Sequence, residues 1–114
     1  MIIEANTNIE IYFSEPISSV KYFFASDDEY DPKAQYIKLI DLSYFDSSSV
    51  KETHYMFYQC SSLEEINFNN FYISKVTNME SMLEGCSNIK SLDLSNFDTS
   101  NVSKMGWMFY ECLL

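Results

Sequence analysis

The segment Ser91–Cys112 reads SLDLSNFDTSNVSKMGWMFYEC, and two earlier segments of the chain follow the same pattern. Glu65–Cys86 reads EINFNNFYISKVTNMESMLEGC, and Leu39–Cys60 reads LIDLSYFDSSSVKETHYMFYQC. The step from one segment to the next is 26 residues both times. A fixed period of about 20–50 residues indicates stacked supersecondary units, because one unit cannot bury its apolar side alone.

Alignment at this period gives five columns that hold the same residue in every unit, and three that stay apolar. The identical columns are Phe45/Phe71/Phe97, Ser48/Ser74/Ser100, Val50/Val76/Val102, Met56/Met82/Met108 and Cys60/Cys86/Cys112, and the apolar ones are Ile40/Ile66/Leu92, Leu42/Phe68/Leu94 and Phe57/Leu83/Phe109. The register never slips by a residue. Neighbouring units are therefore expected to place like side chains next to one another.

Each unit begins with a short alternating stretch. In Ser91–Ser95, Leu92 and Leu94 alternate with polar residues, which is typical of a half-buried strand. The stretch that follows is rich in Asp, Ser, Thr and Asn, whose side chains hydrogen-bond nearby backbone groups. We therefore expect a strand followed by a turn that its own polar side chains hold in place.

The last part of each unit has the spacing of a short helix. The residues at i, i+3, i+4 and i+7 in the last unit are Met105, Met108, Phe109 and Cys112. Such residues share one face of a helix. In the middle unit, Thr77 and Glu80 have the spacing of a capping box at a helix start. Each unit is thus predicted to run from strand to turn to a helix of about two turns.

These patterns predict an α/β fold, a right-handed solenoid with a parallel sheet on one side and short helices on the other. It would contain three full repeats, at residues 39–64, 65–90 and 91–114, within a single structural domain. Residues 1–38 are predicted to form a degenerate N-terminal capping unit. This unit includes a strand-like stretch (Ile9–Phe13), a shortened echo of the repeat (Ser19–Phe24) and an acidic loop (Ser26–Gln35).

Composition narrows the possible partners. The 114 residues carry a net charge of −10, with seven lysines and no arginine. Nucleic acids and anionic lipid surfaces attract basic residues, so neither is an expected partner. No apolar run approaches the ~20 residues of a membrane helix, and we expect no membrane insertion. The first ten residues lack the basic flank and apolar core of a signal peptide.

Few residues are candidates for catalysis or metal binding. The cysteine column is open to three interpretations: an inert row in the core, a disulfide between neighbours, or a metal site. His54 is the single histidine and is expected to be a solvated surface residue. The acidic loop residues Asp27, Asp28, Glu29 and Asp31 form either a solvated loop or a weak calcium site. We expect no catalytic residues, no cofactor and no metal, and hence no enzyme.

The outward-facing columns of the predicted strands form the candidate binding face. Besides Leu39 they contain Glu65, Ser91, Asp41, Asn67, Asp93, Ser43, Asn69 and Ser95. In stacked-repeat proteins such columns make a continuous surface on which partners bind. A polar, merely solvated face is the alternative.

The stretch LDLSNFDTSNVSKMGWMFYEC (Leu92–Cys112) resembles the 26-residue "bacterial surface protein" repeat of BspA-type leucine-rich-repeat surface proteins. The resemblance covers Leu39 to Leu114. It implies a leucine-rich-repeat-like form of the solenoid and a place at the cell surface or in the secreted fraction, although the chain itself shows no signal peptide. It also implies a role in adhesion and host contact.

The sequence thus predicts a non-enzymatic protein-binding or adhesion module, with a host or extracellular-matrix protein as one possible partner. The alternative is a structural fragment or short intracellular scaffold with no ligand of its own. The printed sequence reaches Leu114 where a fourth unit would begin, without a polar capping segment. We expect either a fragment of a longer array or self-association through this uncapped end.

Overall fold

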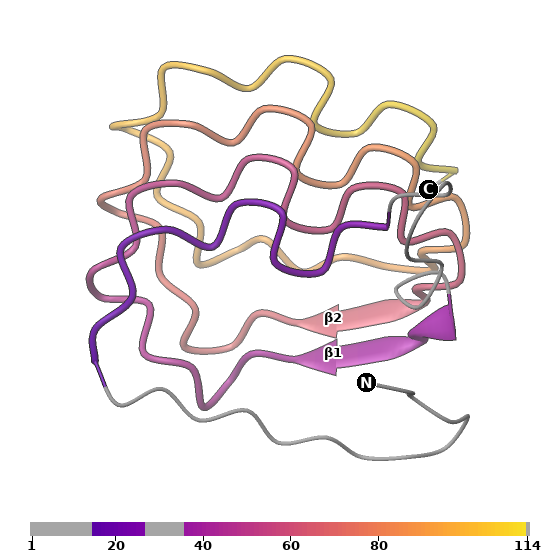
Figure 1. The fold of residues 1–114 in the computed structure, drawn as a ribbon, viewed down its shortest axis with the longest axis horizontal. Helices are drawn as coiled ribbons and strands as arrows, with labels where there is room; N and C mark the ends of the chain where they lie inside the picture. Colours follow the sequence, from indigo (N-terminus) through magenta and orange to yellow (C-terminus); the bar gives the residue numbers. More distant parts are fainter. Residues whose placement is uncertain (1–14, 27–35, 114) are drawn as a thin grey trace.

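The computed structural model describes residues 15–26 and 36–113. Within them, β1 (Leu39–Asp41) and β2 (Glu65–Asn67) form a two-stranded parallel sheet. Ile40 pairs with Ile66 and both are buried, while β1 exposes the residue on either side. The predicted alternation is therefore correct for these two strands, which lie side by side in Figure 1.

A second line of parallel contacts joins four stretches of chain, which we name the first to fourth turn segments. They are residues 19–26, 52–60, 78–86 and 104–112, and the contacts that align them are Ser19 with Glu52, Glu52 with Asn78, and Asn78 with Lys104. Figure 1 shows the four segments as undulating traces, one above another, from indigo to yellow. The spacing between the last three segments is the 26-residue period of the sequence.

The turn segments are joined by hydrogen bonds from alternate backbone amides. Four bonds connect each segment with the next, so the bonds form four rows of three, at N···O distances of 2.8–3.3 Å. One row contains the bonds Val20 N–H to Glu52 O, Thr53 N–H to Asn78 O, and Met79 N–H to Lys104 O. The carbonyl of Glu52 and the amide of Thr53 belong to one peptide group, so each peptide in a row accepts from one neighbour and donates to the other.

Consecutive turns shape the backbone inside each segment. In the third segment, Met82 N–H donates to Met79 O and Cys86 N–H donates to Leu83 O, each three residues back. Ser81 and Gly85 have left-handed φ values of 52° and 80°. A right-handed helix cannot continue through such residues. The segment is therefore a chain of turns whose remaining amides reach the neighbouring segment.

The predicted fold class is wrong. The described residues contain no helix and only two three-residue strands in a small, compact globule, so a leucine-rich-repeat-like α/β solenoid of three helix-bearing repeats does not describe them. The predicted capping box also fails, because Thr77 N–H donates to Lys51 O and starts no helix. Ser91–Ser95 forms no strand. The described part of the chain accordingly holds no helix that could span a membrane.

The core lies between the strand side and the turn segments, and the repeat columns fill it. Its fully enclosed side chains include Val50, Val76, Phe57, Met79, Met82, Leu83, Leu63, Ile73, Cys60 and Cys86. Phe71 is also fully buried, with ring-centroid distances of 5.9 Å to Phe45 and 6.5 Å to Phe97. The prediction that this phenylalanine column occupies the centre of the core is confirmed for Phe71.

Phe71→Ala should lower the free energy of unfolding by ~3–5 kcal/mol, because it leaves a cavity between two phenylalanine rings. The neighbouring Tyr72 is more than half exposed, so Tyr72→Ala should change stability by only about 0.5 kcal/mol. Urea denaturation of both variants measures the difference. Equal losses of stability in the two variants would contradict the packing described above.

Gly85→Ala should destabilise the fold by about 1–2 kcal/mol, because alanine is strained at a φ of 80°. A Cβ at Gly85 would also lie 2.6 Å from Gln59 Cδ, the flexible end of a side chain. Gly106 is the matched control, since a Cβ there meets no atom within 4 Å. Gly106→Ala should be nearly neutral, and adding Gln59→Ala to Gly85→Ala should recover only the part due to the clash.

Candidate functional site

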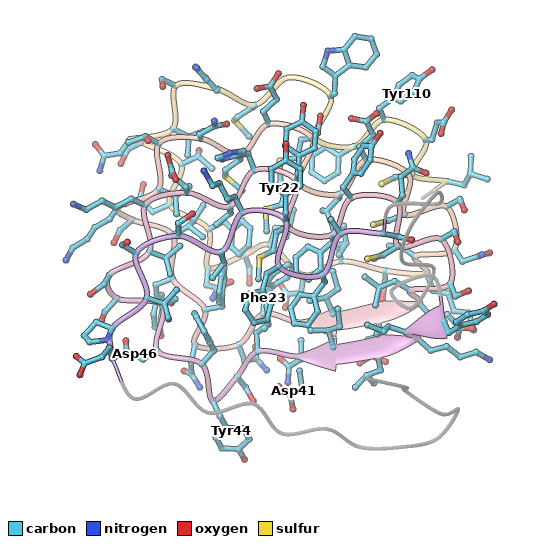
Figure 2. All side chains as sticks on the ribbon, viewed as in Figure 1. Tyr22, Phe23, Asp41, Tyr44, Asp46 and Tyr110 are labelled. Atoms are coloured by element: carbon cyan, nitrogen blue, oxygen red, sulfur yellow. The ribbon has the colours of Figure 1, made fainter. Side chains whose placement is uncertain are left out.

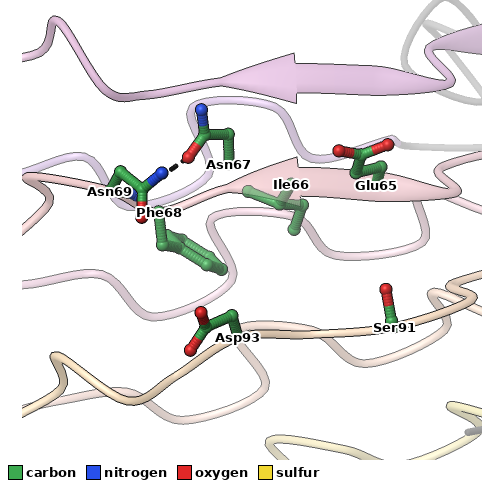
Figure 3. Close-up of a pocket in the computed structure, with 7 residues that line it drawn as sticks. All are labelled: Glu65, Ile66, Asn67, Phe68, Asn69, Ser91 and Asp93. Atoms are coloured by element: carbon green, nitrogen blue, oxygen red, sulfur yellow. Dashed lines mark hydrogen bonds between the residues drawn. The ribbon is translucent and has the colours of Figure 1, made fainter.

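The predicted binding face contains a shallow depression of about 260 Å³. Its lining residues are Glu65, Ile66, Asn67, Phe68, Asn69, Ser91 and Asp93. Figure 3 shows them along β2 and the neighbouring stretch that carries Ser91 and Asp93. Ile66 and Phe68 are buried beneath it, whereas the polar residues remain accessible to solvent. The accessible lining of the depression is therefore mostly polar, and Ile66 and Phe68 belong to the core beneath it.

Five of the eight predicted face residues line this depression. The structure places Glu65, Asn67, Asn69, Ser91 and Asp93 around it. The other three, Asp41, Ser43 and Ser95, are not among its lining residues. The sequence missed Ile66 and Phe68 as parts of the site, because alternation assigns them to the core and gives no sign that a surface depression reaches them.

One column of the face has a structural role. Asp41 Oδ1 accepts the backbone N–H of Ser43 at 2.9 Å. Asn67 and Asp93 accept the N–H two residues further on in the same way, each at 3.0 Å. Such bonds close tight turns at the ends of strands. The side-chain oxygens of this column thus hold the backbone in place while they face solvent.

The turns after the strands use the same device. Asp46 Oδ1 accepts the N–H of Ser48, and Asp98 Oδ1 accepts the N–H of Ser100, each at 3.0 Å. The expectation that polar side chains fix these turns is confirmed. Figure 2 shows Asp41 beside the strands and Asp46 at the left edge of the molecule.

These hydrogen bonds extend the negative charge of the face to lower pH. The hydroxyl and the backbone N–H of Ser43 hold the pKa of Asp41 below its usual value, and Ser95 lowers the pKa of Asp93 in the same way. A lowered pKa stabilises the fold above the ordinary pKa near 3.8, and the effect disappears as pH falls through the folded-state value. Both carboxylates are therefore ionised at neutral pH.

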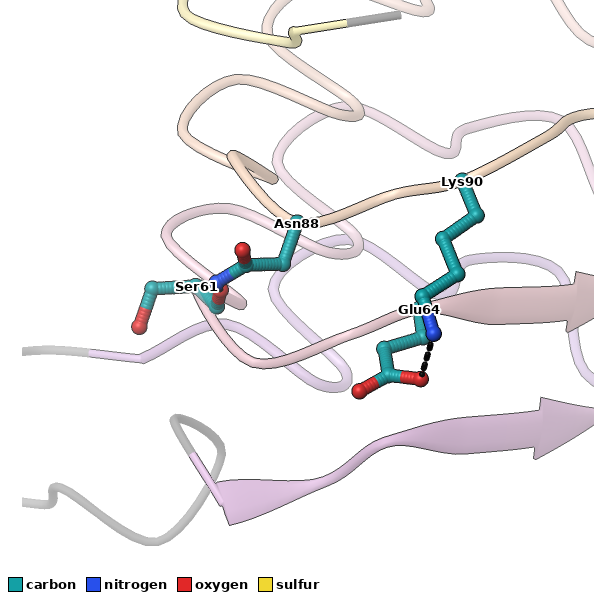
Figure 4. Close-up of polar contacts among 4 residues, drawn as sticks. All are labelled: Ser61, Glu64, Asn88 and Lys90. Atoms are coloured by element: carbon teal, nitrogen blue, oxygen red, sulfur yellow. Dashed lines mark hydrogen bonds and ion pairs between the residues drawn. The ribbon is translucent and has the colours of Figure 1, made fainter.

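A column of alternating charge flanks the face. Lys90 Nζ lies 2.8 Å from Glu64 Oε2, as Figure 4 shows. The hydrogen bond and charge of Lys90 lower the pKa of Glu64, and Lys38 in the preceding unit adds a weaker effect. The same pair raises the pKa of Lys90. Because the side chains are 37% and 74% exposed, this ion pair contributes little to stability.

Asparagine side chains connect adjacent units at several positions. Asn96 Nδ2 donates to the carbonyls of Phe68 (3.0 Å) and Phe71 (3.2 Å). The other such donors are Asn70 to Ser43 O, Asn88 to Ser61 O (Figure 4) and Asn101 to Ser74 O. Tyr44 takes the asparagine position in the first repeat and is 97% exposed, with its ring directed into solvent in Figure 2. The asparagine column is thus incomplete.

The three cysteines are free thiols in one column. Cys60, Cys86 and Cys112 each donate an S–H hydrogen bond to a carbonyl of the preceding turn segment, at 3.0, 3.2 and 2.9 Å. Cys60 and Cys86 are buried as predicted, whereas Cys112 is only partly buried. Burial raises the pKa of Cys60 to about 12 and also raises the pKa of Cys86 and Cys112. Thiols held in this protonated form are poor nucleophiles and poor metal ligands.

Two other predictions concern histidine and acidic residues. His54 is half-buried, so its prediction as a solvated surface residue is wrong. Its ring centroid lies 6.1 Å from that of Tyr22 and 6.0 Å from that of Tyr55. His54 Nδ1 has no hydrogen-bond partner within the described ranges. The acidic loop residues 27–31 lie outside those ranges, and no group of three metal-binding side chains occurs inside them.

Comparison with known proteins supplies a family. The chain matches, over residues 28–113, the family described as "Mycoplasma protein of unknown function, DUF285", and it belongs to that family. The match spans the strands, the candidate face and the last three turn segments. Neither the curated proteins nor the solved structures yield a significant match to the chain.

The buried thiols should make the fold sensitive to alkali. Above about pH 9 the unfolded thiol ionises, whereas Cys60 stays protonated up to about pH 12. Between these pH values the folded protein holds a proton on Cys60 that the unfolded chain has lost. The free energy of unfolding should therefore fall by up to ~1.4 kcal/mol per pH unit from this residue alone. Guanidinium denaturation from about pH 8 to about pH 10.5 tests this, and Cys60→Ala should show a flatter decline. Equal slopes for the two proteins would refute the assignment.

Proposed function

We propose that the chain is a non-enzymatic protein-binding or adhesion module of a surface protein, and that it binds through the face beside β2. The observation that carries the proposal is the depression of about 260 Å³, whose accessible lining is mostly polar. A protein segment laid there would meet the polar side chains of Glu65, Asn67 and Asp93. Direct hydrogen bonds between polar groups are common to protein interfaces.

The charge of the face favours a basic partner. Glu65 and Asp93 place carboxylates on the rim, and Asp41 adds a third on β1. The chain as a whole has a net charge of −10, which speeds association with a partner of opposite sign. We therefore propose a partner surface that presents lysine or arginine side chains. The proposal involves no catalytic step, cofactor or metal.

The resemblance of the repeat supports a role at the cell surface. DUF285 is the family that the chain belongs to, and its repeat in this chain resembles that of BspA-type surface proteins. Adhesion and a cell-surface or secreted location follow from the resemblance, and they form part of the proposal. A host or extracellular-matrix protein with a basic patch is the partner that fits both the resemblance and the charge.

One observation favours a second candidate, a structural unit with no ligand of its own. Asp41, Asn67 and Asp93 each use a side-chain oxygen to close a turn of their own backbone. Their presence on the face therefore has a structural explanation that needs no partner. The two candidates differ in whether the charge of these residues matters once the hydrogen bond is kept.

Asp93→Asn separates charge from structure. Asn67 makes the same turn bond as Asp93, so the asparagine variant should keep the fold while it removes one negative charge. If the face binds a basic partner, Asp93→Asn should weaken binding about 3–10-fold. Glu65→Arg should weaken it more. Surface plasmon resonance with immobilised chain and purified extracellular-matrix proteins measures both effects.

Glu84→Arg is the matched control, because it changes the net charge as Glu65→Arg does but lies in the third turn segment, away from the lining residues. It should leave binding within about twofold of the wild type. Equal losses for Glu84→Arg and Glu65→Arg would assign binding to overall charge. No binding to any basic matrix protein, with Asp93→Asn as stable as the wild type, would favour the structural unit.

A further inference from the structure

The rows of hydrogen-bonded peptides all point the same way. In every row the N–H groups point from the first turn segment toward the fourth, and the carbonyls point back. The two outer edges therefore differ in kind. The fourth segment presents only amide donors, and the first segment presents only carbonyl acceptors, from the peptide groups that the rows use.

Among the described residues, the donor edge meets no hydrogen-bond acceptor. The amides of Met105, Trp107, Phe109 and Glu111 continue the four rows, and none of them donates a hydrogen bond within the described residues. In the inner segments the equivalent amides all reach a carbonyl of the next segment. Four donors at alternate residues are thus ready for an acceptor edge of matching spacing.

Side chains of the fourth turn segment are more exposed than their equivalents in the inner segments. Phe109 is 43% exposed, while Phe57 and Leu83 in its column are fully buried. Met105 is 44% exposed, while Met79 in its column is fully buried. The residues are of the same kind, so the difference comes from the segment that covers the inner ones. Trp107 is 62% exposed and packs edge-on against Tyr110, which Figure 2 shows at this end.

The first turn segment is the complementary edge. The carbonyls of Ser19, Lys21 and Ala25 continue the rows backward and accept no hydrogen bond from a described residue. Tyr22 is 55% exposed and stacks on Tyr55, with ring centroids 4.9 Å apart. This segment therefore offers both acceptors and an aromatic ring at the repeat positions.

We propose that the 114-residue chain associates head to tail, with the fourth turn segment of one copy docked on the first turn segment of a second copy. The amides of Met105, Trp107 and Glu111 would then donate to the carbonyls of Ser19, Lys21 and Ala25 of the second copy, with the geometry of the internal rows. Trp107 would stack on the partner copy's Tyr22, as Tyr22 stacks on Tyr55 within one chain. Phe109 would meet Phe24 of the second copy, as Phe24 meets Phe57 at 5.6 Å.

The polarity of the rows excludes the symmetric arrangement. Two fourth segments placed face to face would oppose donors to donors, and two first segments would oppose acceptors to acceptors. A contact between unlike edges does not close on itself, so it leads to chains of copies. The net charge of −10 on each copy opposes association, and added salt should strengthen it by screening this repulsion.

Analytical ultracentrifugation of the 114-residue chain tests the proposal, from about 0.02 to about 1 mM protein and at about 0.05 and about 0.5 M salt. The mean mass should rise above the 13.3 kDa of one chain with concentration, and more steeply at the higher salt. Trp107→Asp and Tyr22→Asp should each abolish the rise. Both positions have left-handed φ values near 60°, which aspartate tolerates. Tyr72→Asp, at an exposed tyrosine of the middle repeat whose column holds Asp46 and Asp98, should associate as the wild type does.

Mixing the two defective variants gives the decisive result. Trp107→Asp keeps an intact first segment and Tyr22→Asp keeps an intact fourth segment, so an equimolar mixture should form a heterodimer of twice the monomer mass and nothing larger. A wild type that stays monomeric at the highest protein and salt concentrations would overturn the proposal. Association of either variant alone would overturn it as well, since that requires contacts between like edges.

Discussion

The rest of the structure depends on the rows of peptides that cross the four turn segments. Each peptide in a row accepts from one segment and donates to the next, and chains of hydrogen bonds of this kind polarise and strengthen one another. The bonds fix the register between segments, so residues 26 apart share a column. This register places Phe71 between Phe45 and Phe97 and sets each cysteine beneath a carbonyl of the preceding segment.

Much of the core could be predicted from the sequence, although the backbone could not. Met79, Met82, Leu83 and Cys86 have helical spacing and are all fully buried. A chain of turns with alternating left-handed residues gives the same side-chain spacing as a helix, so periodicity does not separate the two. The sequence gives little indication of these left-handed residues, because only Gly85 among those of the turn segments is glycine. Tyr55 and Trp107 adopt φ values near 60° that their residue types do not favour.

The candidate face shows a similar division. Alternation in β1 and β2 correctly placed the polar columns outside. It could not show that Asp41 and Asp93 close turns of their own backbone, because an acidic residue on a strand face looks the same in either role. Nor could it show the depression, which depends on how far the stretch after residue 90 lies from β2.

The two proposed surfaces differ in what they recognise, and salt should separate them. The edge of the fourth segment is defined by backbone amides, so it selects another edge of the same geometry, and aromatic side chains refine the fit. The face beside β2 is defined by side-chain charge, so it selects a partner by sign. Screening removes repulsion between two copies that each have a charge of −10, but it also removes attraction between the acidic face and a basic partner. Added salt should thus favour the first contact and weaken the second, which distinguishes the two in a solution that contains both.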